Sequence, residues 1–307
     1  MVHNVRGNLP LKVVNFIMNL RTNTHPFYLS RCVKEANPML ITIHTYIYTY
    51  IHGHPHPSTL NSLHCRHGQS EYNAICRIGG DSKLSEHGLA YAHKLAEFVE
   101  TTIVKDRQGN DVPGRLWTST LRRTRETAQF IKQNKILISD RDDPTIKVEW
   151  VQMRPRAWHH LDELFAGSCD GMTYEEIEAA FPEEFDRRSV DKLAYRYPRG
   201  ESYLDVIARL EPIIIEMERH REPLLVVGHQ GILRIIYAFY MGLTRAEAPY
   251  VSIPLNTVIE LVPSVFSCAE TRTVLYCPET QLAKDGQDEP QGRGGKKDSF
   301  NVDPQSH

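Results

Sequence analysis

Apolar and polar positions follow regular periods from about residue 66 onward, and these periods predict an α/β protein. Apolar residues return to one helical face over 84–100 and again over 202–219. Residues 224–227 form a continuous apolar run, typical of a strand buried on both faces of a parallel sheet. Shorter segments continue the alternation, with strands predicted at 115–119 and 146–151 and helices at 120–133, 174–181 and 231–241. The pattern predicts a three-layer α/β/α sandwich with a mostly parallel central sheet.

The first 65 residues do not fit this alternation. Residues 27–30, F-Y-L-S, have the composition of a short strand, but the segment that follows them leads into no helix. Five of the fifteen histidines fall within 52–67, interleaved with prolines. We therefore predict that 32–65 is an inserted, disordered loop. We also predict that 278–307, a polar segment rich in Gly, Gln, Asp and Lys, is a disordered tail.

The histidine-rich part of this loop offers ligands for a metal ion. Its candidates are His52, His54, His56 and His64. A solvated loop of histidine and proline explains the same composition more simply. We therefore predict that the chain holds no metal ion and needs no cofactor.

Charge and apolar content exclude nucleic acid and membranes as expected binding partners. Lys and Arg number 36 and Asp and Glu number 38, so the formal net charge is −2. Such a balance gives no basic surface for nucleic acid or for an anionic membrane. The longest strongly apolar stretch, 39–51, is shorter than the ~20 residues that a membrane-spanning helix needs. The N-terminus also lacks the pattern of a signal peptide.

The cysteines indicate the compartment. Six scattered cysteines form no C-x-x-C pair, so we predict neither a disulfide framework nor a cysteine-rich zinc site. We therefore expect a cytoplasmic protein that binds neither nucleic acid nor membrane. Homodimer formation is compatible with this composition.

The motif R-H-G-Q-S-E-Y-N over 66–73 is the strongest local signal for chemistry. In open α/β sheets, ligands bind beyond the carboxyl ends of strands and near helix N-termini. In such a loop Arg66 offers paired donors to a phosphate, and Gly68 lets the backbone approach closely beside His67. For this motif alone, a surface histidine in a turn is the alternative.

Two further motifs place basic residues where strands lead into helices. His229 follows the apolar run in V-V-G-H-Q-G, and Arg122 and Arg123 open a helix in S-T-L-R-R-T. An anionic ligand would offset the unfavourable interaction of these arginines with the helix dipole. A structural histidine and two solvated arginines are the alternatives.

Two adjacent acidic residues complete the candidate set. Asp162 and Glu163 lie among apolar neighbours in L-D-E-L-F-A-G, and a glutamic acid in such a setting can protonate a leaving group. Ordinary loop charges are the alternative. Two histidines, arginines and a glutamate together suit phosphoryl transfer through a phosphohistidine. In that chemistry a neutral imidazole attacks phosphorus while positive charge holds the phosphate oxygens.

These motifs resemble the histidine phosphatase superfamily, of which R-H-G is the signature. Four segments are similar to the bisphosphatase domain of the bifunctional 6-phosphofructo-2-kinase/fructose-2,6-bisphosphatases: R-I-G-G-D-S (77–82), W-T-S-T-L-R-R-T (117–124), G-M-T-Y-E-E-I (171–177) and Y-R-Y-P-R-G-E-S-Y-L-D (195–205). The resemblance covers 13–31 and 66 to about 262. It implies a phosphoglycerate mutase-like fold and hydrolysis of fructose-2,6-bisphosphate. A broader sugar phosphatase, a mutase or an inactive binding domain are the alternatives.

The resemblance also implies a role for each site residue. It makes His67 the phosphate acceptor, His229 its partner and Glu163 the proton donor. The transferred phosphate would be held by Arg66, Asn73 and Arg123. The sugar and its 6-phosphate would be bound by Gly80, Tyr174, Arg188, Lys192, Tyr203, Gln230 and Arg234. Two separate groups of cations suit a sugar that carries two phosphates.

The chain departs from this family in two ways. It has no G-x-x-x-x-G-K-[ST] phosphate loop, so it resembles an isolated bisphosphatase half, with 1–31 as connector and first strand and 66–277 as the phosphatase domain. The other departure is 32–65, because excising 32–66 restores the uninterrupted F-Y-L-S-R-H-G-Q-S. We therefore predict that 60–66, L-N-S-L-H-C-R, is a poor central strand and that 27–30 fills the centre of the sheet. The insertion would then displace His67 and lower both stability and activity.

Overall fold

A computed structural model describes residues 62–278 apart from 107, 141–142, 144, 221 and 264–267. Within them, the chain forms a six-stranded sheet in the order β5-β2-β6-β1-β7-β8. The strands are β1 (Ser62–Arg66), β2 (Arg115–Thr118), β5 (Pro155–Ala157), β6 (Leu224–Gly228), β7 (Thr257–Pro263) and β8 (Cys268–Val274). β1, β2, β5 and β6 run parallel, whereas β7 and β8 are antiparallel to their neighbours. The predicted mostly parallel sheet is confirmed.

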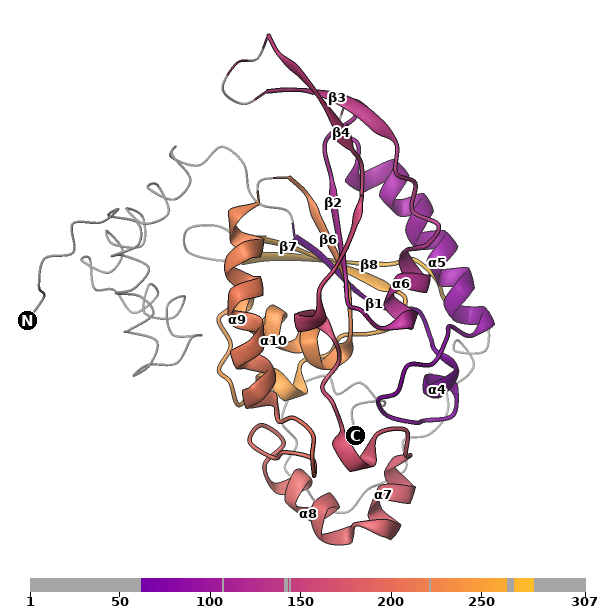
Figure 1. The fold of residues 1–307 in the computed structure, drawn as a ribbon, viewed down its shortest axis with the longest axis vertical. Helices are drawn as coiled ribbons and strands as arrows, with labels where there is room; N and C mark the ends of the chain where they lie inside the picture. The colour runs from indigo at the N-terminus through magenta and orange to yellow at the C-terminus, as the bar shows by residue number, and fades with distance from the viewer. Residues whose placement is uncertain are drawn as a thin grey trace, which may run out of the picture.

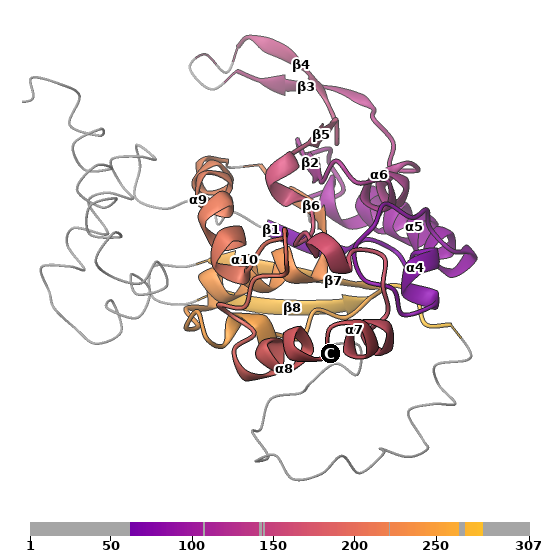
Figure 2. The ribbon, with the colours of Figure 1, turned by 60° about the horizontal axis from the view of Figure 1, so that its bottom comes forward.

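Helices cover both faces of this sheet (Figure 1). The longer ones are α5 (Glu86–Phe98), continued by the π-helical segment η1 (Val99–Ile103), α9 (Tyr203–Arg219) and α10 (Gln230–Met241). The shorter ones are α4 (Glu71–Ala74), α6 (Arg122–Ala128), α7 (Tyr174–Ala180), α8 (Pro182–Val190) and the 3-10 turns η2 (His159–Leu161), η3 (Gly167–Cys169) and η4 (Ala248–Tyr250). Figure 2 shows α5 and α6 on one side of the sheet and α9 and α10 on the other. The predicted three layers are therefore confirmed.

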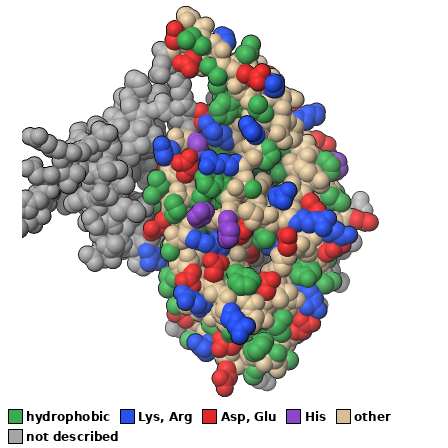
Figure 3. All heavy atoms as spheres, viewed as in Figure 1, with side chains coloured by type: hydrophobic (Ala, Val, Ile, Leu, Met, Phe, Trp, Pro, Cys, Tyr) green, Lys and Arg blue, Asp and Glu red, His purple; other side chains and the backbone are tan. Residues whose placement is uncertain are grey.

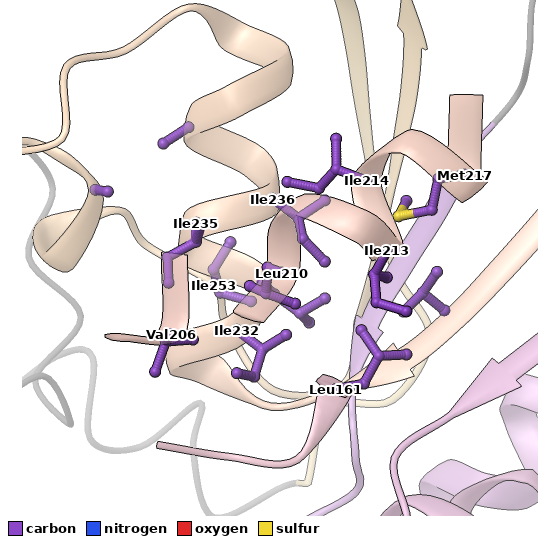
Figure 4. Close-up of a cluster of buried hydrophobic side chains, with 14 of the residues drawn as sticks. Leu161, Val206, Leu210, Ile213, Ile214, Met217, Ile232, Ile235, Ile236 and Ile253 are labelled. Carbon is purple, nitrogen blue, oxygen red and sulfur yellow. The ribbon is translucent and has the colours of Figure 1, made fainter. Parts of the chain in front are cut away.

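Each face of the sheet carries its own apolar core. On one face, Leu210 of α9 and Ile236 of α10 pack in the same cluster as Val226 of β6 (Figure 4). On the other face, Leu95 of α5 packs in the same cluster as Leu225 of β6. Successive residues of β6 thus enter opposite cores, which explains why its sequence is continuously apolar.

β3 (Lys135–Ser139) and β4 (Lys147–Val151) form a separate two-stranded antiparallel sheet. This hairpin extends away from the central sheet at the top of Figure 1. The strand predicted at 146–151 is therefore present but lies outside the central sheet. Both strands are exposed or half-buried, and Leu137 is 71% exposed. An apolar pattern shows that a strand can form, but it does not show which sheet the strand joins.

Acidic and basic side chains intermix over the face shown in Figure 3. This mixture matches the near-zero net charge of the sequence. Among the residues with described placement, no helix is both long enough and apolar enough to span a membrane.

The centre of the sheet corrects the prediction for the insertion. Residues 62–66 form the central strand β1, which is buried along its whole length and pairs with β6 and β7. Leu63 and Cys65 enter an apolar core, while the Ser62 hydroxyl and His64 Nε2 lie 2.8 Å apart and hydrogen-bond each other. This hydrogen bond gives each of the two side chains a polar partner, and β6 and β7 pair with the backbone on both sides. A partly polar segment can therefore occupy a buried strand.

The rest of the N-terminal prediction lies outside the described residues, including 27–30, the histidines at 52, 54 and 56, and most of the tail at 278–307. The prediction that 62–65 belongs to a disordered loop is wrong. His67 directly follows β1, and its backbone N–H donates to the Gly228 carbonyl at 3.0 Å. The predicted displacement of His67 from the end of the sheet is therefore wrong as well.

Placing a histidine in the central strand has an electrostatic consequence. His64 is buried, and this burial lowers its pKa from 6.5 to about 3, so the ring is neutral in the folded protein. Its Nδ1 has no hydrogen-bond partner. A buried polar atom without a partner costs about 1–3 kcal/mol.

We expect the free energy of unfolding to fall as the pH drops below about 6.5, because the unfolded chain protonates His64 while the folded chain keeps it neutral down to about pH 3. Each histidine that is protonated only in the unfolded chain adds ~1.4 kcal/mol per pH unit to the slope of the free energy of unfolding against pH. Denaturant unfolding from about pH 7 to pH 5 measures the slope. The double variant Ser62→Ala/His64→Leu should flatten it and be more stable at pH 7. His159→Asn, at an exposed histidine, is the control, and equal slopes in both variants would contradict the assignment.

Candidate active site

Three strand ends bring the candidate residues to one place. β1 ends at Arg66, opposite Gly228 of β6, so His67 and His229 both leave the sheet at its carboxyl edge. β2 pairs with the other side of β6 and leads through Ser119 into α6, which carries Arg123. The rings of His67 and His229 lie 5.1 Å apart between centroids. The structure therefore brings together the histidines and arginine that the sequence analysis assigned to one site.

The hydrogen bonds of His67 determine which of its two ring nitrogens carries the proton. Nδ1 lies 2.7 Å from the Gly68 carbonyl oxygen, which can only accept, so Nδ1 carries the proton. Nε2 accepts a hydrogen bond from Arg123 Nε at 3.1 Å. The lone pair of Nε2 therefore faces the Arg123 guanidinium, and an unprotonated nitrogen is what a nucleophilic imidazole needs.

His229 has the opposite arrangement of its ring nitrogens. Arg123 Nε also donates to His229 Nδ1, at 3.2 Å. The proton of His229 is therefore on Nε2, which lies 2.7 Å from the Ser119 hydroxyl and donates to it. Ser119 in turn lies 2.8 Å from the Thr124 hydroxyl. The sequence analysis missed Ser119, although its position directly after β2 in the W-T-S-T motif marks it as a candidate.

Burial and positive charge keep both histidines neutral. Burial lowers the pKa of His67 well below 6.5, and the charges of Arg123 and Arg66 lower it further. Burial is also the main cause for His229, whose pKa is likewise lowered by Arg123 and by His67. A neutral His67 at physiological pH keeps its nucleophilic lone pair available.

The arginines are held by backbone carbonyls around the histidines. Arg66 is buried, and its Nη1 donates to the Ile253 carbonyl at 3.2 Å. Arg123 is also buried, and its Nη1 donates to the Gly80 carbonyl at 2.6 Å. Gly80 has a φ of +62°, a left-handed conformation that favours glycine. The glycine pair in R-I-G-G-D-S thus forms the turn that supplies this carbonyl.

Two of the predicted phosphate and substrate contacts are engaged within the protein. Asn73 Oδ1 accepts from the backbone N–H of Ser70 at 3.1 Å and closes the capping box of α4. The Gly80 backbone N–H donates to an Asp170 carboxylate oxygen at 3.0 Å. Neither group contacts the histidines directly in this arrangement.

The acidic residues separate into two environments. The Glu163 carboxylate accepts from the backbone N–H of Leu164 at 2.9 Å and from that of Gly231, at the start of α10, at 3.3 Å. The Asp162 carboxylate instead accepts from the backbone N–H and the hydroxyl of Thr120, both at 2.7 Å. Glu163 therefore contacts the backbone of Gly231, two residues after His229, whereas the Asp162 carboxylate braces the loop before α6.

A second group of cations gathers near the acid. Arg188 lies over the ring of Tyr174 at 5.1 Å, and Arg234 Nη1 donates to the Tyr203 hydroxyl at 3.3 Å. Burial, together with the nearby charges of Arg234 and Arg188, lowers the pKa of Lys192 from 10.5 to about 7. Arg188 lies in α8, Lys192 in the turn that follows it and Arg234 in α10, and the mutual repulsion of the three cations makes this place suitable for an anionic group.

Gly231 lies between the Glu163 carboxylate and the Tyr203 hydroxyl, which is linked to the second group of cations through Arg234. A Cβ added at this glycine would lie 2.7 Å from Glu163 Oε1 and 3.7 Å from the Tyr203 hydroxyl. Gln230, the remaining predicted contact, begins α10 between His229 and this glycine. Within the described part of the chain, no group of three or more His, Cys, Asp or Glu is arranged to hold a metal ion.

Residues 63–265 match the family model of the histidine phosphatase superfamily (branch 1). The chain is 43% identical over 220 residues to fructose-2,6-bisphosphatase of Saccharomyces cerevisiae, covering 72% of this chain and 43% of the yeast protein. It is 38% identical over 271 residues to a 6-phosphofructo-2-kinase/fructose-2,6-bisphosphatase of Arabidopsis thaliana, covering 88% of this chain and 28% of the plant protein. The chain thus spans less than half the length of these two relatives.

Solved structures share the fold. Alpha-ribazole phosphatase from Shigella flexneri superposes with a TM-score of 0.53 at 20% identity, covering 70% of this chain and 96% of that one. A mycobacterial glucosyl-3-phosphoglycerate phosphatase superposes with a TM-score of 0.51 at 26% identity, covering 71% of this chain and 98% of that one. The phosphoglycerate mutase-like fold expected from the sequence is therefore confirmed.

Proposed function

Because the chain belongs to the histidine phosphatase superfamily, we propose that it hydrolyses fructose-2,6-bisphosphate to fructose 6-phosphate and phosphate. The observation that carries the proposal is the second group of cations, Arg188, Lys192 and Arg234, of which Arg234 lies on α10, the helix that His229 caps. A sugar with two phosphates would engage both places at once. The yeast relative named fructose-2,6-bisphosphatase, at 43% identity, supports the same substrate.

In the first step Nε2 of His67 attacks the phosphorus of the 2-phosphate. A nitrogen–phosphorus bond forms and the bond from phosphorus to the sugar oxygen breaks. Glu163 in its protonated form gives its proton to the departing alkoxide. Arg66 and Arg123 hold the charged oxygens of the transferring group.

In the second step water attacks the phosphohistidine. The Glu163 carboxylate takes a proton from this water, the nitrogen–phosphorus bond breaks, and phosphate leaves. A bound phosphate favours the protonated form of His229, because an adjacent negative charge raises the pKa of an imidazole. His229 can then donate from Nδ1 to a phosphate oxygen.

The remaining predicted contacts fit the sugar and its 6-phosphate. Arg188, Lys192 and Arg234 would bind the 6-phosphate, and the hydroxyls of Tyr174 and Tyr203 would line the same region. Gly80, Gln230 and Asn73 complete the proposed contacts. The 6-phosphate contributes affinity and orientation, because it takes no part in bond breaking.

Release of inorganic phosphate from purified protein tests the function. We expect release from fructose-2,6-bisphosphate and far slower release from fructose 6-phosphate. Equal rates on the two would favour a broader sugar phosphatase, and isomerisation of a phosphoglycerate would favour a mutase. Binding of the bisphosphate without release would favour an inactive binding domain.

The KM for the bisphosphate should rise as the pH increases through about 7, because Lys192 loses its charge there. Lys192→Arg keeps a positive charge at all these pH values and serves as the matched control. Steady-state kinetics between about pH 6 and pH 8 should therefore give a smaller rise in KM for the variant than for the wild type. The same pH dependence in both proteins would remove Lys192 from the 6-phosphate site.

We also propose a cytoplasmic location. The described cysteines, Cys65, Cys76, Cys169, Cys268 and Cys277, are all free, which supports a reducing compartment. Homodimer formation stays a prediction, and sedimentation of the purified chain tests it.

A further inference from the structure

We propose that the ion pair between Arg209 and Glu201 is a positioning device for the carboxyl group of Glu163. The inference rests on the proposed function, in which Glu163 protonates the leaving alkoxide. Among the described residues, neither Arg209 nor Glu201 hydrogen-bonds to the histidines or to the second group of cations, although the charge of Arg209 contributes to the lowered pKa of His229. Both instead hold the backbone of the short segment that carries the acid.

Arg209 binds this segment through its carbonyls. Its Nη2 donates to the carbonyl oxygens of Asp162 at 2.7 Å and Glu163 at 3.3 Å, and its Nη1 donates to that of His160 at 2.5 Å. A guanidinium has a planar fork of donors and no acceptor, so it can hold several carbonyls in a fixed relation. Arg209 thus holds the backbone of Glu163 itself and the backbone of the residues that precede it.

Glu201 completes the anchor on the C-terminal side. Its carboxylate accepts from Arg209 Nε at 2.8 Å and Nη2 at 3.0 Å, and from the backbone N–H of Phe165 at 3.0 Å. The backbone N–H of Glu201 donates to the Phe165 carbonyl at 2.9 Å. The single pair therefore connects to the backbone on both sides of Glu163.

The surrounding packing makes this anchor rigid. A Cβ added at Gly200 would lie 2.4 Å from the Phe165 carbonyl oxygen, so the two loops touch backbone to backbone. Leu161 is fully buried in the same core as Val206 and Leu210 of α9, the helix that carries Arg209 (Figure 4). The acid-bearing segment is thus fixed to α9 by one apolar side chain and one guanidinium.

A displacement of the acid should affect one chemical step. Misplacing a reacting group by ~1 Å can slow a reaction by ~10²-fold. Glu163 is needed when the leaving group is a sugar alkoxide, but a nitrophenolate leaves without protonation. Loss of the anchor should therefore slow phosphohistidine formation from a sugar phosphate and spare its formation from p-nitrophenyl phosphate.

Arg209→Lys and Glu201→Gln test the proposal in single-turnover measurements of phosphohistidine formation. We expect ~10–100-fold slower formation from fructose-2,6-bisphosphate and less than ~3-fold change from p-nitrophenyl phosphate. Arg196→Lys is the matched control, because Arg196 pairs with Asp205 of α9 and, among the described residues, makes no hydrogen bond or ion pair with the acid-bearing segment. Equal losses on both substrates, or no loss on either, would overturn the proposal.

A second measurement separates positioning from general stability. In a Glu163→Gln background the acid is already lost, so adding Arg209→Lys should cause no further slowing. Additive losses would show that Arg209 acts elsewhere. If the wild type forms no phosphohistidine from fructose-2,6-bisphosphate, the proposed function fails. Fructose 6-phosphate then serves as the sugar phosphate in the same comparison with p-nitrophenyl phosphate. A wild type that forms phosphohistidine from none of these substrates overturns both proposals.

Discussion

Replacing His67 with alanine is expected to abolish phosphate transfer. Nε2 of this residue is unprotonated, points toward Arg123 at 3.1 Å, and belongs to a ring that burial keeps neutral. His229 also has an unprotonated nitrogen that faces Arg123, but the hydrogen bond from its Nε2 to Ser119 holds the other side of its ring. We expect phosphate release to fall by ~10⁴–10⁶-fold, as for other enzymes that lose their nucleophile.

Substrate labelled at the 2-phosphate checks this expectation directly. The wild type should retain an acid-labile, base-stable label on His67, and His67→Ala should retain none. His229→Ala is the informative companion, because it should slow labelling but leave the label on His67. Label that persists in His67→Ala would assign the nucleophile elsewhere, with His229 as the next candidate.

Replacing Glu163 with glutamine is expected to slow turnover by ~10²–10⁴-fold, the usual effect of losing a general acid. The amide cannot protonate the leaving alkoxide, although it keeps the size of the side chain and can still accept from the Gly231 backbone. Substrate affinity should change much less, because the proposed function assigns the binding of the two phosphates to arginines and a lysine rather than to Glu163. Single-turnover rates and equilibrium binding measured on the same protein separate the two effects.

Asp162→Asn is the matched control for this variant. Its carboxylate is bound by Thr120 at 2.7 Å, so its role is to brace the loop and its loss should affect stability more than the leaving-group step. A p-nitrophenyl phosphate substrate should restore phosphohistidine formation in Glu163→Gln. Unchanged turnover in Glu163→Gln together with a large loss in Asp162→Asn would exchange the two roles.

Much of the fold could be predicted from local periodicity. The helices at 203–219 and 230–241 and the strand at 224–228 match their predicted segments closely, because each buries a continuous apolar face. Helix α6 stops at Ala128 and is shorter than predicted. Strands β7 and β8 and helix α8 were not predicted, and β8 and α8 are exposed enough that their side chains carry little apolar period.

The central strand is where local pattern failed. Ser62 and His64 are unfavourable for a buried strand when each is judged alone. In the folded chain they hydrogen-bond each other, and two neighbouring strands supply the backbone partners. Partners far along the chain decide whether a polar residue can be buried, so single-residue propensity could not anticipate this strand.

The sequence by itself determined the family, the layered architecture and the set of chemical groups. Motifs such as R-H-G and G-H-Q-G identify the family and its reactive side chains, and the apolar periodicity predicts the layers. Only the tertiary structure decided how those groups act. It placed the proton of His67 on Nδ1 and that of His229 on Nε2, through hydrogen bonds to Gly68 and Ser119. It also linked Arg209 to the backbone of the acid. Such relations depend on distances between residues remote in sequence, which the folding of the whole chain sets.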